Sequence, residues 1–579
     1  MNQPQIAERL EAIATLMELK GENPFKIKAF TSGARLVETL EADLAELVAA
    51  GSLRSIKGIG PALAEVITEL VTTGQSTVYT ELKADTPEGL IEMLTVPGLG
   101  PKKIKAIYEG LGITTVGELE YACNENRLAG LAGFGAKTQD KILAGIQLMK
   151  QSRGKFLCSE ALGVAEELLK ALQGHPAVQR SAIAGSLRRA KETVKDADLI
   201  ASSDEAEAVM AFFVSLPQVK EVVAHGPTKS SVRLENGLSI DLRVVRDADY
   251  PFTLHHFTGS KEHNTLMRQR ALSRGLKLNE YGLWRGEERI ECRDEEEIFK
   301  ALDLAYVPPE LREGMGELEL AEARTLPELV SQGDLAGIFH VHTTFSDGAG
   351  TLEQMVKAAQ ALGYRYIGIS DHSQAAAYAH GLTPERIAEQ HAEIDRLNQA
   401  LTGIRILKGI EADILADGSV DYDPEVLARF DFVIASIHSR FGMDKEAMTE
   451  RIVRALRNPY VTILGHMTGR LLLSREPYEL DLERIFREAA EHGVAIELNA
   501  NPHRLDLDWR YMRRALELGV TIAINPDAHS VSGLQHVRYG VGIARKGGVP
   551  AERVLNSLDA EALAERLAAR RERAMAEAQ

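Results

Sequence analysis

Apolar and polar residues follow three different patterns along the chain. Residues 1–150 carry apolar side chains at spacings of three and four, with almost no strand-like alternation, which predicts helices throughout. From about residue 155 the pattern becomes a mixture of strands and helices. Beyond residue 335 an apolar run followed by a helical stretch recurs seven times. Because these runs are spaced by roughly 30 residues, they predict parallel strands of a barrel-like α/β fold.

An acidic segment separates the second pattern from the third. Residues 301–334 hold eight acidic residues against two basic ones. Such a charge excess indicates a solvated linker and a domain boundary.

Helical hairpins recur in the first region. The stretches "IKGIGPALAEVI" and "VPGLGPKKIKAI" each place a Gly-apolar-Gly turn before a predicted helix, and "LAGFGAKTQDKI" is a looser third copy. Glycines allow close backbone approach, and the amides at the following helix N-terminus favour a phosphate. One such turn alone is an ordinary helix connection, but three copies favour DNA-backbone binding. The candidate DNA-binding residues are Gly58, Gly60, Gly98, Gly100, Lys102 and Lys103.

Three aspartates lie on predicted strands of the second region. Asp196 and Asp198 are two residues apart, so they share one face of a strand, and Asp241 lies on another amphipathic strand. Like charges held together are destabilising unless a cation lies between them. Beside Ser186 and Arg189, the set suits two Mg²⁺ ions that bridge a triphosphate and an attacking hydroxyl. The structural alternative is a surface turn rich in Asp.

The segment that carries the aspartates resembles the palm of family X DNA polymerases, within the nucleotidyltransferase superfamily. Residues 255–283, "HHFTGSKEHNTLMRQRALSRGLKLNEYGL", resemble the nucleotide-binding thumb segment of that family. The resemblance implies that Asp196 and Asp198 bind both metal ions, Mg²⁺ or Mn²⁺. It implies that Asp241 binds the catalytic ion and helps to deprotonate the primer 3' hydroxyl.

The same resemblance implies the nucleotide-binding residues. Ser186 and Arg189 would hold the triphosphate. The other implied contacts are Phe257, Gly259 and Asn264 at the sugar and base, and Arg268 near the template strand.

The chain departs from the animal repair enzymes of this family at three positions. His256 stands where those enzymes usually have Tyr, which leaves discrimination against ribonucleotides open, and Lys195 replaces Gly before the first metal aspartate. Val66 aligns with their Schiff-base lysine. Because valine has no amine to form that adduct, we expect deoxyribose phosphate lyase activity to be absent or weak.

Polar side chains lie at, or just past, the ends of the seven apolar runs. They are His340 and His342, then Asp347, His372, Glu411, His438 and His466, and finally Asp527 and His529. A single histidine at a strand end is usually structural, but nine potential ligands at the C-terminal rim mark a barrel active site. Imidazole mixed with carboxylate suits Mn²⁺, Zn²⁺ or Fe²⁺ better than Mg²⁺. Arg440, Arg470 and Arg504 follow these runs and are candidates for binding substrate phosphate.

This set resembles the PHP (polymerase and histidinol phosphatase) domain, whose nine ligands hold a trinuclear metal site that hydrolyses phosphoesters. The resemblance implies three ions bound by the nine residues. Asp371, beside His372, is expected to support the site or end a strand rather than to bind metal.

The two resemblances imply a multidomain fold. It combines an all-α helix-hairpin-helix region, an α/β nucleotidyltransferase palm with an α+β thumb, and a distorted (β/α)7-type PHP barrel. The expected domains are a helix-hairpin-helix domain at 1–80, fingers at 81–150, palm at 151–248, thumb at 249–315, a linker at 316–334 and the PHP phosphoesterase domain at 335–579.

Composition changes this picture little. The net charge of −17 argues against a nucleic-acid partner, but local motifs can outweigh a global sum. We expect a cytoplasmic protein without membrane association, because no export signal and no apolar run approaching about 18 residues is found.

The expected function is that of a bacterial-type family X DNA polymerase with a PHP 3'-5' exonuclease, filling short gaps during base excision repair. Gapped or primed DNA and deoxynucleoside triphosphates are the expected partners of a monomer. Two alternatives stay open. The PHP domain could act mainly on a small phosphate ester, or the chain could be a DNA-binding scaffold with impaired catalysis.

Overall fold

The computed structural model describes residues 1, 3–40, 42–124, 128, 131, 133–152, 154–473 and 475–577. These residues form two compact units, and each is described by itself. The first consists mainly of residues up to 153, and the second contains most of residues 154–579. No helix within the described ranges combines the length and the apolar character needed to cross a membrane.

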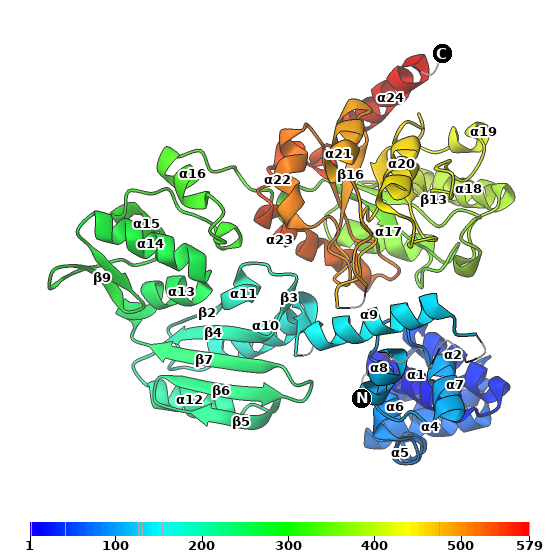
Figure 1. The fold of residues 1–579 in the computed structure, drawn as a ribbon, viewed down its shortest axis with the longest axis horizontal. Helices are drawn as coiled ribbons and strands as arrows, with labels where there is room; N and C mark the ends of the chain where they lie inside the picture. Colours follow the sequence, from blue (N-terminus) through cyan, green and yellow to red (C-terminus); the bar gives the residue numbers. More distant parts are fainter. Residues whose placement is uncertain are drawn as a thin grey trace. The chain divides into compact units, whose positions relative to one another are not determined.

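The first unit is helical, as its apolar spacing predicts. Leu10, Ile13 and Met17 recur along one face of its first helix and are buried in the core of the unit. Its described helices are α1 (Gln3–Lys20), α2 (Pro24–Thr39), α3 (Leu44–Ala49), α4 (Pro61–Thr73), α5 (Thr77–Ala84), α6 (Glu88–Met93), α7 (Pro101–Leu111), α8 (Val116–Asn124) and α9 (Ala136–Ser152) (Figure 1).

The second unit begins with the palm region, whose described strands form a five-stranded sheet in the order β2-β4-β7-β6-β5. Along β4, Leu199 faces a core that includes α10 and α12, while Ile200 faces Tyr250 and Leu254 of α13. This alternation puts Asp196 and Asp198 on the α13 side of the sheet. The elements are β1 (Phe156–Leu157), α10 (Cys158–Gln173), β2 (Arg180–Ala184), α11 (Gly185–Arg188), β3 (Thr193–Val194), β4 (Asp196–Ser202), α12 (Ala206–Val214), β5 (Val219–His225), β6 (Lys229–Leu234) and β7 (Ser239–Val245).

The thumb region follows, with helices packed around a small antiparallel sheet and its own apolar core. Its elements are α13 (Tyr250–Thr258), α14 (Lys261–Ser273), β8 (Lys277–Asn279), β9 (Gly282–Arg285), β10 (Glu288–Ile290) and α15 (Glu295–Ala301).

The expectation that residues 301–334 are a solvated linker is wrong. The segment includes α16 (Glu317–Ala323) and places Val307, Leu318 and Ala321 in the core of the thumb. Its acidic side chains are not all exposed either, since Glu317 is buried against His263, with 2.8 Å between Oε1 and Nδ1. The excess of acidic residues did not reveal that some of them pair with buried basic groups.

The third pattern forms the barrel. Its described strands make a parallel seven-stranded sheet in sequence order, and a parallel bridge between Val341 and Ala528 brings the first and last strands together. The strands are β11 (Gly337–Val341), β12 (Tyr366–Ile369), β13 (Arg405–Asp413), β14 (Phe432–Ser436), β15 (Ile463–Leu464), β16 (Ala495–Asn499) and β17 (Ile522–Asn525). The predicted succession of seven parallel strands is confirmed.

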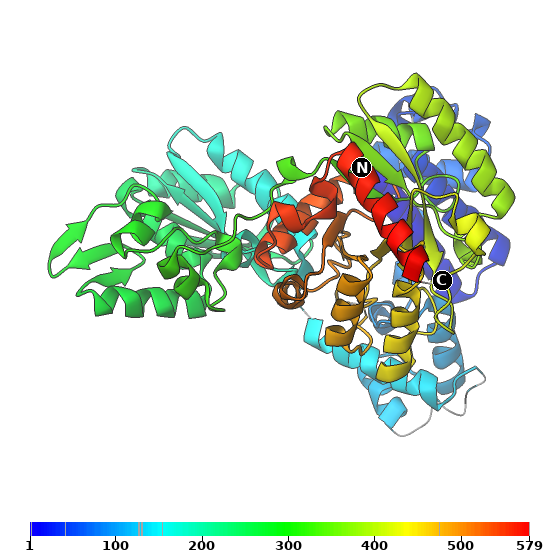
Figure 2. The same cartoon turned by 90° about the horizontal axis from the view of Figure 1, so that it is seen from above.

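Helices surround the strands of the barrel. They are α17 (Leu352–Ala361), α18 (Pro384–Ala400), α19 (Pro424–Leu427), α20 (Lys445–Leu456), α21 (Leu482–Glu491), α22 (Trp509–Glu517), α23 (Val537–Lys546) and α24 (Ala560–Glu577). Figure 2 shows α24 lying along the barrel, where its Leu563 packs with Phe339 and Phe432 of the strands.

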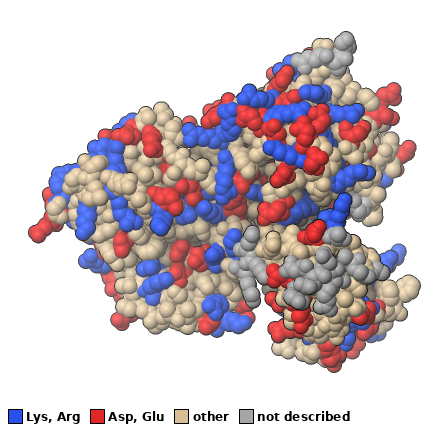
Figure 3. Space-filling view, viewed as in Figure 1, with Lys and Arg blue, Asp and Glu red and all other residues tan. Residues whose placement is uncertain are grey.

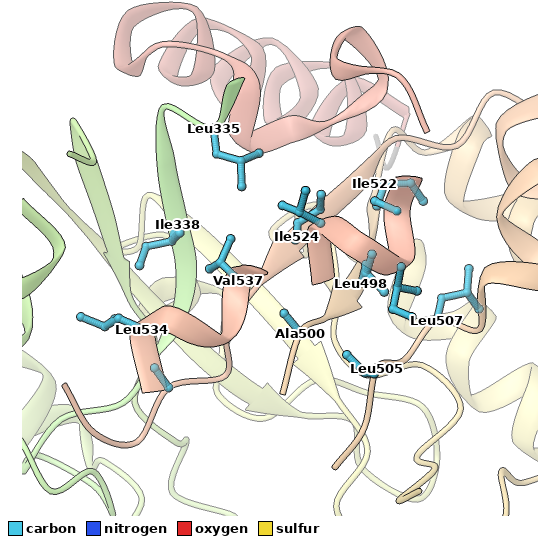
Figure 4. Close-up of a cluster of buried hydrophobic side chains, with 14 of the residues drawn as sticks. Leu335, Ile338, Leu498, Ala500, Leu505, Leu507, Ile522, Ile524, Leu534 and Val537 are labelled. Atoms are coloured by element: carbon cyan, nitrogen blue, oxygen red, sulfur yellow. The ribbon is translucent and has the colours of Figure 1, made fainter. Parts of the chain in front are cut away.

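Apolar side chains anchor α23 to the barrel. Val537 at the start of this helix and Leu534 just before it lie in the same buried cluster as Ile338, Leu498 and Ile524 of the strands (Figure 4). The position of α23 is therefore fixed by the barrel core.

Charged side chains are mixed over the barrel surface. On the face viewed in Figure 3, Lys and Arg side chains are interspersed with Asp and Glu side chains. Although the chain has a net negative charge, its acidic residues do not form a separate patch on this face.

Candidate functional site

The three palm aspartates converge on two neighbouring strands. Asp198 of β4 and Asp241 of β7 are direct partners in the parallel register, and Asp196 lies two residues earlier on the same face. Burial raises the pKa of Asp198 to about 6, and the nearby charges of Asp196 and Asp241 add to this effect. Lys229 of β6 places its Nζ 2.5 Å from Oδ2 of Asp241. Oxygen ligands around this much negative charge fit Mg²⁺ or Mn²⁺.

The turn at Gly185, between β2 and α11, approaches this site closely. Gly185 has φ +64, and a Cβ there would lie 2.1 Å from Oδ2 of Asp198, so only glycine fits. Ser186 follows on α11, which starts directly after β2, the antiparallel neighbour of β4.

The implied nucleotide-binding residues adjoin this turn from the thumb side. Nε of Arg189 donates to Oε1 of Glu313 at 3.0 Å, and its Nη1 donates to the carbonyl of Thr258. A Cβ on Gly259 would lie 3.1 Å from the same Nη1.

Phe257, Asn264 and Arg268 belong to the two helices that meet at Gly259. The guanidinium of Arg243 on β7 lies 4.0 Å from the ring centroid of Phe257. Nδ2 of Asn264 donates to the carbonyl of His256 at 2.7 Å, and Nε of Arg268 donates to the carbonyl of Asn264 at 3.3 Å. These contacts hold Phe257, Asn264 and Arg268 at the junction of α13 and α14, and their role in nucleotide binding stays a prediction.

The nine polar residues of the barrel rim form one cluster centred on Glu411, which is buried at most positions but exposed at Asp347. Oε1 of Glu411 lies 3.2 Å from Nε2 of His340, 3.2 Å from Nε2 of His438 and 3.0 Å from Nε2 of His466. Its Oε2 lies 3.0 Å from Nδ1 of His372. One carboxylate therefore contacts imidazoles that come from four other strands or strand ends.

The remaining residues complete the cluster around His342. Its ring nitrogens lie 3.8 Å from Oδ1 of Asp347 and 3.4 Å from Oδ1 of Asp527, and its ring stacks on that of His529 with 4.1 Å between centroids. Such separations exceed a good hydrogen bond, whereas two ligand atoms about 2.1 Å from one tetrahedral ion are roughly 3.4 Å apart. Four overlapping groups in the cluster bring ligand atoms within 4.8 Å of one another, and together they include all nine residues. The donor set therefore fits a multi-metal site.

Protonation differs strongly between the imidazoles. Burial, followed by the neighbouring His529 and His372, lowers the pKa of His342 to about 3, so this ring is neutral and able to bind a metal at pH 7. Burial lowers the pKa of His438 too, but Glu411 and Asp413 outweigh it and raise the pKa to about 10.

Outer carboxylates orient two of the imidazoles. Oε1 of Glu497 lies 2.6 Å from Nδ1 of His340, and Oδ1 of Asp413 lies 2.8 Å from Nδ1 of His438. These contacts leave each Nε2 directed at the cluster. His340 and Asp527 also have left-handed backbones, with φ 59 and φ 49, a strained conformation that functional sites often hold.

Asp371 lies outside the cluster of candidate ligands. Its buried carboxylate accepts hydrogen bonds from Thr343, Ser346 and Gln390. This arrangement fits the expected supporting role.

The three candidate phosphate-binding arginines differ. Arg470 is buried and its guanidinium contacts Asp508 and the carbonyls of Arg504 and Leu505, which gives it a structural role instead. Arg504 places its Nε 3.4 Å from Oδ2 of Asp527, at the cluster. Arg440 is exposed.

The glycine hairpins of the first unit have the predicted geometry. Gly58 (φ 106) and Gly98 (φ 80) have left-handed backbones, and Gly60 and Gly100 directly precede α4 and α7. A Cβ on Gly60 or Gly100 would meet nothing within 4 Å among the described residues. Internal packing therefore does not require glycine there, which leaves the surface open to the close approach of a ligand.

Lysines follow the second hairpin. The side chain of Lys102 is 87% exposed, and Nζ of Lys103 donates to the carbonyl of Gly98 at 3.2 Å. In the looser third copy Gly133 has φ 86 before α9, while residue 132 lies outside the described residues.

Sequence reasoning missed several residues of both sites. Glu497 lies in the sixth apolar run, "VAIELNA", where a glutamate inside a fully buried strand was a usable signal. Lys229 and Glu313 gave no such signal, because each pairs with a side chain on another element of the fold.

Family models match four parts of the chain. A helix-hairpin-helix domain model matches residues 1–76, and a SAM-like helix-hairpin-helix tandem model matches residues 90–147. A DNA polymerase beta thumb model matches residues 253–313, and a PHP domain model matches residues 339–501.

Known proteins resemble the chain as a whole and in part. The DNA polymerase/3'-5' exonuclease PolX of Bacillus subtilis is 42% identical over 96% of this chain and 98% of that protein. A probable phosphatase of Thermoanaerobacter sp. is 28% identical over 38% of this chain and 89% of that protein. A crystal structure of Leishmania infantum polymerase beta is 25% identical, covering 40% of this chain and all of that one, with a TM-score of 0.25 that is too low to compare the folds.

Proposed function

The chain belongs to the bacterial PolX family of DNA polymerases with a C-terminal PHP domain, and we propose that its two sites carry out nucleotide addition and 3'-end removal separately. It is a DNA polymerase with 3'-5' exonuclease activity. The observation that carries the proposal is the presence of two separate clusters of side chains able to bind metal, one on β4 and β7 and one around Glu411. Short gaps in DNA, as in base excision repair, are the proposed substrate of the monomeric protein.

The palm aspartates act in nucleotide addition. Asp196, Asp198 and Asp241 would hold Mg²⁺ or Mn²⁺, which supplies charge stabilisation for phosphoryl transfer. The primer 3'-hydroxyl oxygen bonds to the α-phosphorus of the incoming nucleotide, pyrophosphate leaves, and Asp241 is placed to take the hydroxyl proton. Ser186 and Arg189 bind the triphosphate.

The thumb side of the site holds the rest of the nucleotide. Phe257, Gly259 and Asn264 border the sugar and base, and Arg268 approaches the template strand. The contact of Asn264 with the His256 carbonyl supports this arrangement, because it fixes the end of α13 against α14.

The cluster around Glu411 acts in 3'-end removal. Its nine residues would hold three ions, Mn²⁺, Zn²⁺ or Fe²⁺, which supply Lewis-acid stabilisation of phosphodiester hydrolysis. Arg504, beside Asp527, is placed to bind the phosphate of the 3'-terminal nucleotide.

The first unit binds the DNA backbone at Gly58, Gly60, Gly98, Gly100, Lys102 and Lys103. A pocket of about 880 Å³ in the same unit is lined by Lys26 and Arg54 as well as by Glu65 and Glu69, and its two basic side chains are the proposed contacts of the 5' phosphate at the far side of a gap. Val66 lines the same pocket and offers no amine, so lyase chemistry by a Schiff base at position 66 is not expected.

A second candidate for the barrel is hydrolysis of a small phosphate ester. It is favoured by the similarity of this part to probable phosphatases, which lack the rest of the chain. The helical hairpins and the palm carboxylates of the same chain favour a DNA end instead.

Labelled primers on gapped DNA distinguish these functions. With Mg²⁺ or Mn²⁺ and nucleotides the protein should extend the primer across the gap, and with Mn²⁺ alone it should shorten the primer from its 3' end. Hydrolysis of a small ester such as p-nitrophenyl phosphate without primer shortening would favour the second candidate. If the protein neither extends nor shortens the primer, the remaining hypothesis is a DNA-binding scaffold with impaired catalysis.

A further inference from the structure

The end of helix α23 in the barrel reaches the palm loop that carries Arg189. Nζ of Lys546, the last residue of α23, donates to the carbonyl of Arg189 at 2.8 Å and to the carbonyl of Glu310 at 3.3 Å. A Cβ on Gly542, one turn earlier, would lie 3.3 Å from Cβ of Ala190 in the same loop. The Lys546 side chain is 0% exposed, so these contacts fix it completely.

One carboxylate connects Lys546 with the guanidinium of Arg189. Oε1 of Glu313 lies 2.5 Å from Nζ of Lys546 and 3.0 Å from Nε of Arg189. Its Oε2 lies 3.3 Å from Nζ of Lys191. The other side of the Arg189 guanidinium is held by the carbonyl of Thr258.

The charges around Glu313 favour an anionic ligand at Arg189. A carboxylate paired with Arg189 alone would cancel the charge of the guanidinium and repel a triphosphate. Here Lys546 and Lys191 share that carboxylate, so the three cations outweigh its single negative charge. Burial raises the pKa of Glu313, but Lys546 and Arg189 outweigh it and lower the pKa, which keeps the group ionised.

We propose that Lys546, a residue of the barrel, is a positioning residue for nucleotide addition: through Glu313 and the Arg189 carbonyl it holds the Arg189 guanidinium in place and leaves its positive charge available to the triphosphate. This inference rests on the proposed role of Arg189. It makes the exonuclease part of the chain a structural component of the polymerase site.

Single-turnover titration with a deoxynucleoside triphosphate on gapped DNA tests the proposal, because it separates nucleotide affinity from the rate of addition. Lys546→Met should raise the apparent Kd for the nucleotide about 10-fold while changing the maximal rate by less than about threefold. Lys546→Gln keeps a donor for the two carbonyls but removes the charge, and it should weaken nucleotide binding similarly. An unchanged Kd in a folded variant of either kind would overturn the proposal.

The neighbouring residue provides a matched control. Arg545 also joins the barrel to the thumb, with 2.7 Å between its Nε and Oε1 of Glu310, but it does not contact Arg189 or Glu313 in the described contacts. Arg545→Met should leave the nucleotide Kd within about twofold of wild type. An equal rise in both variants would mean that any loosening of this junction weakens nucleotide binding, and Lys546 would lose its specific role.

A second substitution separates charge from structure. In Lys546→Met, the carboxylate of Glu313 keeps only Lys191 and Arg189 as partners and so offsets more of the charge of Arg189. Adding Glu313→Gln should therefore recover much of the lost affinity. A merely structural role predicts no recovery. Arg189→Gln tests the underlying assignment: if this variant binds nucleotide normally, the proposed function of Arg189 fails. If only Arg189→Gln weakens binding, the role of Lys546 fails.

Discussion

Asp198 and Asp241 are direct partners across the parallel strands β4 and β7, although they lie 43 residues apart in the sequence. Asp241→Ala should therefore lower kcat for nucleotide addition by at least about 10²-fold, because it removes charge stabilisation at that site. Degradation of the same primer with Mn²⁺ should stay near the wild-type rate. The reciprocal variant, His342→Ala, should lose degradation and keep extension. Loss of both activities in either variant would contradict two separate sites.

Glu497 is expected to determine metal affinity in the barrel without binding metal. Its Oε1 accepts from Nδ1 of His340 and Nδ2 of Asn525, and its Oε2 accepts from the backbone N–H of His466 and Nδ2 of Asn499. Gln at this position would therefore turn an amide donor toward one of these two pairs of donors. Glu497→Gln should weaken Mn²⁺ binding about 10- to 100-fold. Metal content after dialysis and exonuclease rate against Mn²⁺ concentration measure this effect. Glu488→Gln is the control and should behave as wild type, because Glu488 on α21 pairs with the half-exposed Arg457, away from the cluster around Glu411.

Exonuclease activity should fall as the pH is lowered, because the imidazoles of the cluster must lose a proton before they bind a metal ion. His438 shows the direction, since Glu411 and Asp413, against the effect of burial, raise its pKa to about 10, and a metal ion must displace that proton. Protons and metal therefore compete. A tenfold increase in Mn²⁺ concentration should lower the pH at which the exonuclease rate begins to fall. If this pH does not change with Mn²⁺ concentration, protons and metal do not compete.

A 5' phosphate at the far side of a short gap should increase extension, because the first unit would hold that end while the palm holds the primer. Lys26→Ala should abolish the advantage, since Lys26 lines the pocket of that unit. Lys28→Ala, an exposed lysine that is not among the pocket-lining residues, is the matched control. Equal extension of phosphorylated and unphosphorylated gaps by wild type would remove the pocket from this role.

The buried carboxylate of Glu295 should stabilise the thumb region. Burial raises its pKa, but Arg312 and Arg188, each with a nitrogen 2.5 Å from one of its oxygens, outweigh burial and lower the pKa to about 2. Because the folded value lies below the unfolded one, the contribution is complete above about pH 4.5 and is lost as the pH falls toward 2. Glu295→Gln should destabilise the thumb by about 3–5 kcal/mol, because it leaves Arg312 buried without its counter-charge.

Fluorescence of Trp284 during urea unfolding, in a Trp509→Phe background, measures this thumb stability. Glu297→Gln is the control, because its partner Arg293 is 88% exposed and such a surface pair contributes less than about 1 kcal/mol. Equal effects of the two substitutions would contradict the importance of the buried charge.

Local spacing allowed much of the fold and the clustering of both sets of candidate metal ligands to be predicted. The two-residue spacing of Asp196 and Asp198 fixes their common face in any strand, and glycine pairs such as Gly98 and Gly100 predict a turn before a helix wherever they lie. Runs of apolar residues with helices between them likewise predict parallel strands whose ends meet at one rim. These inferences need only neighbouring residues and the geometry of one element.

Partners distant in the sequence were decided by the tertiary structure alone. His340 and Glu497 are 157 residues apart, and Lys546 and Arg189 are 357 residues apart, yet both pairs are in hydrogen-bond contact. The acidic segment 301–334 was misjudged for the same reason, because the basic groups that bury Glu317 and Glu313 lie elsewhere in the chain. The sequence by itself determined which side chains are available and which way each element presents them. Only folding decided which charges meet in the low-dielectric interior, where pairing determines whether a buried carboxylate is tolerated.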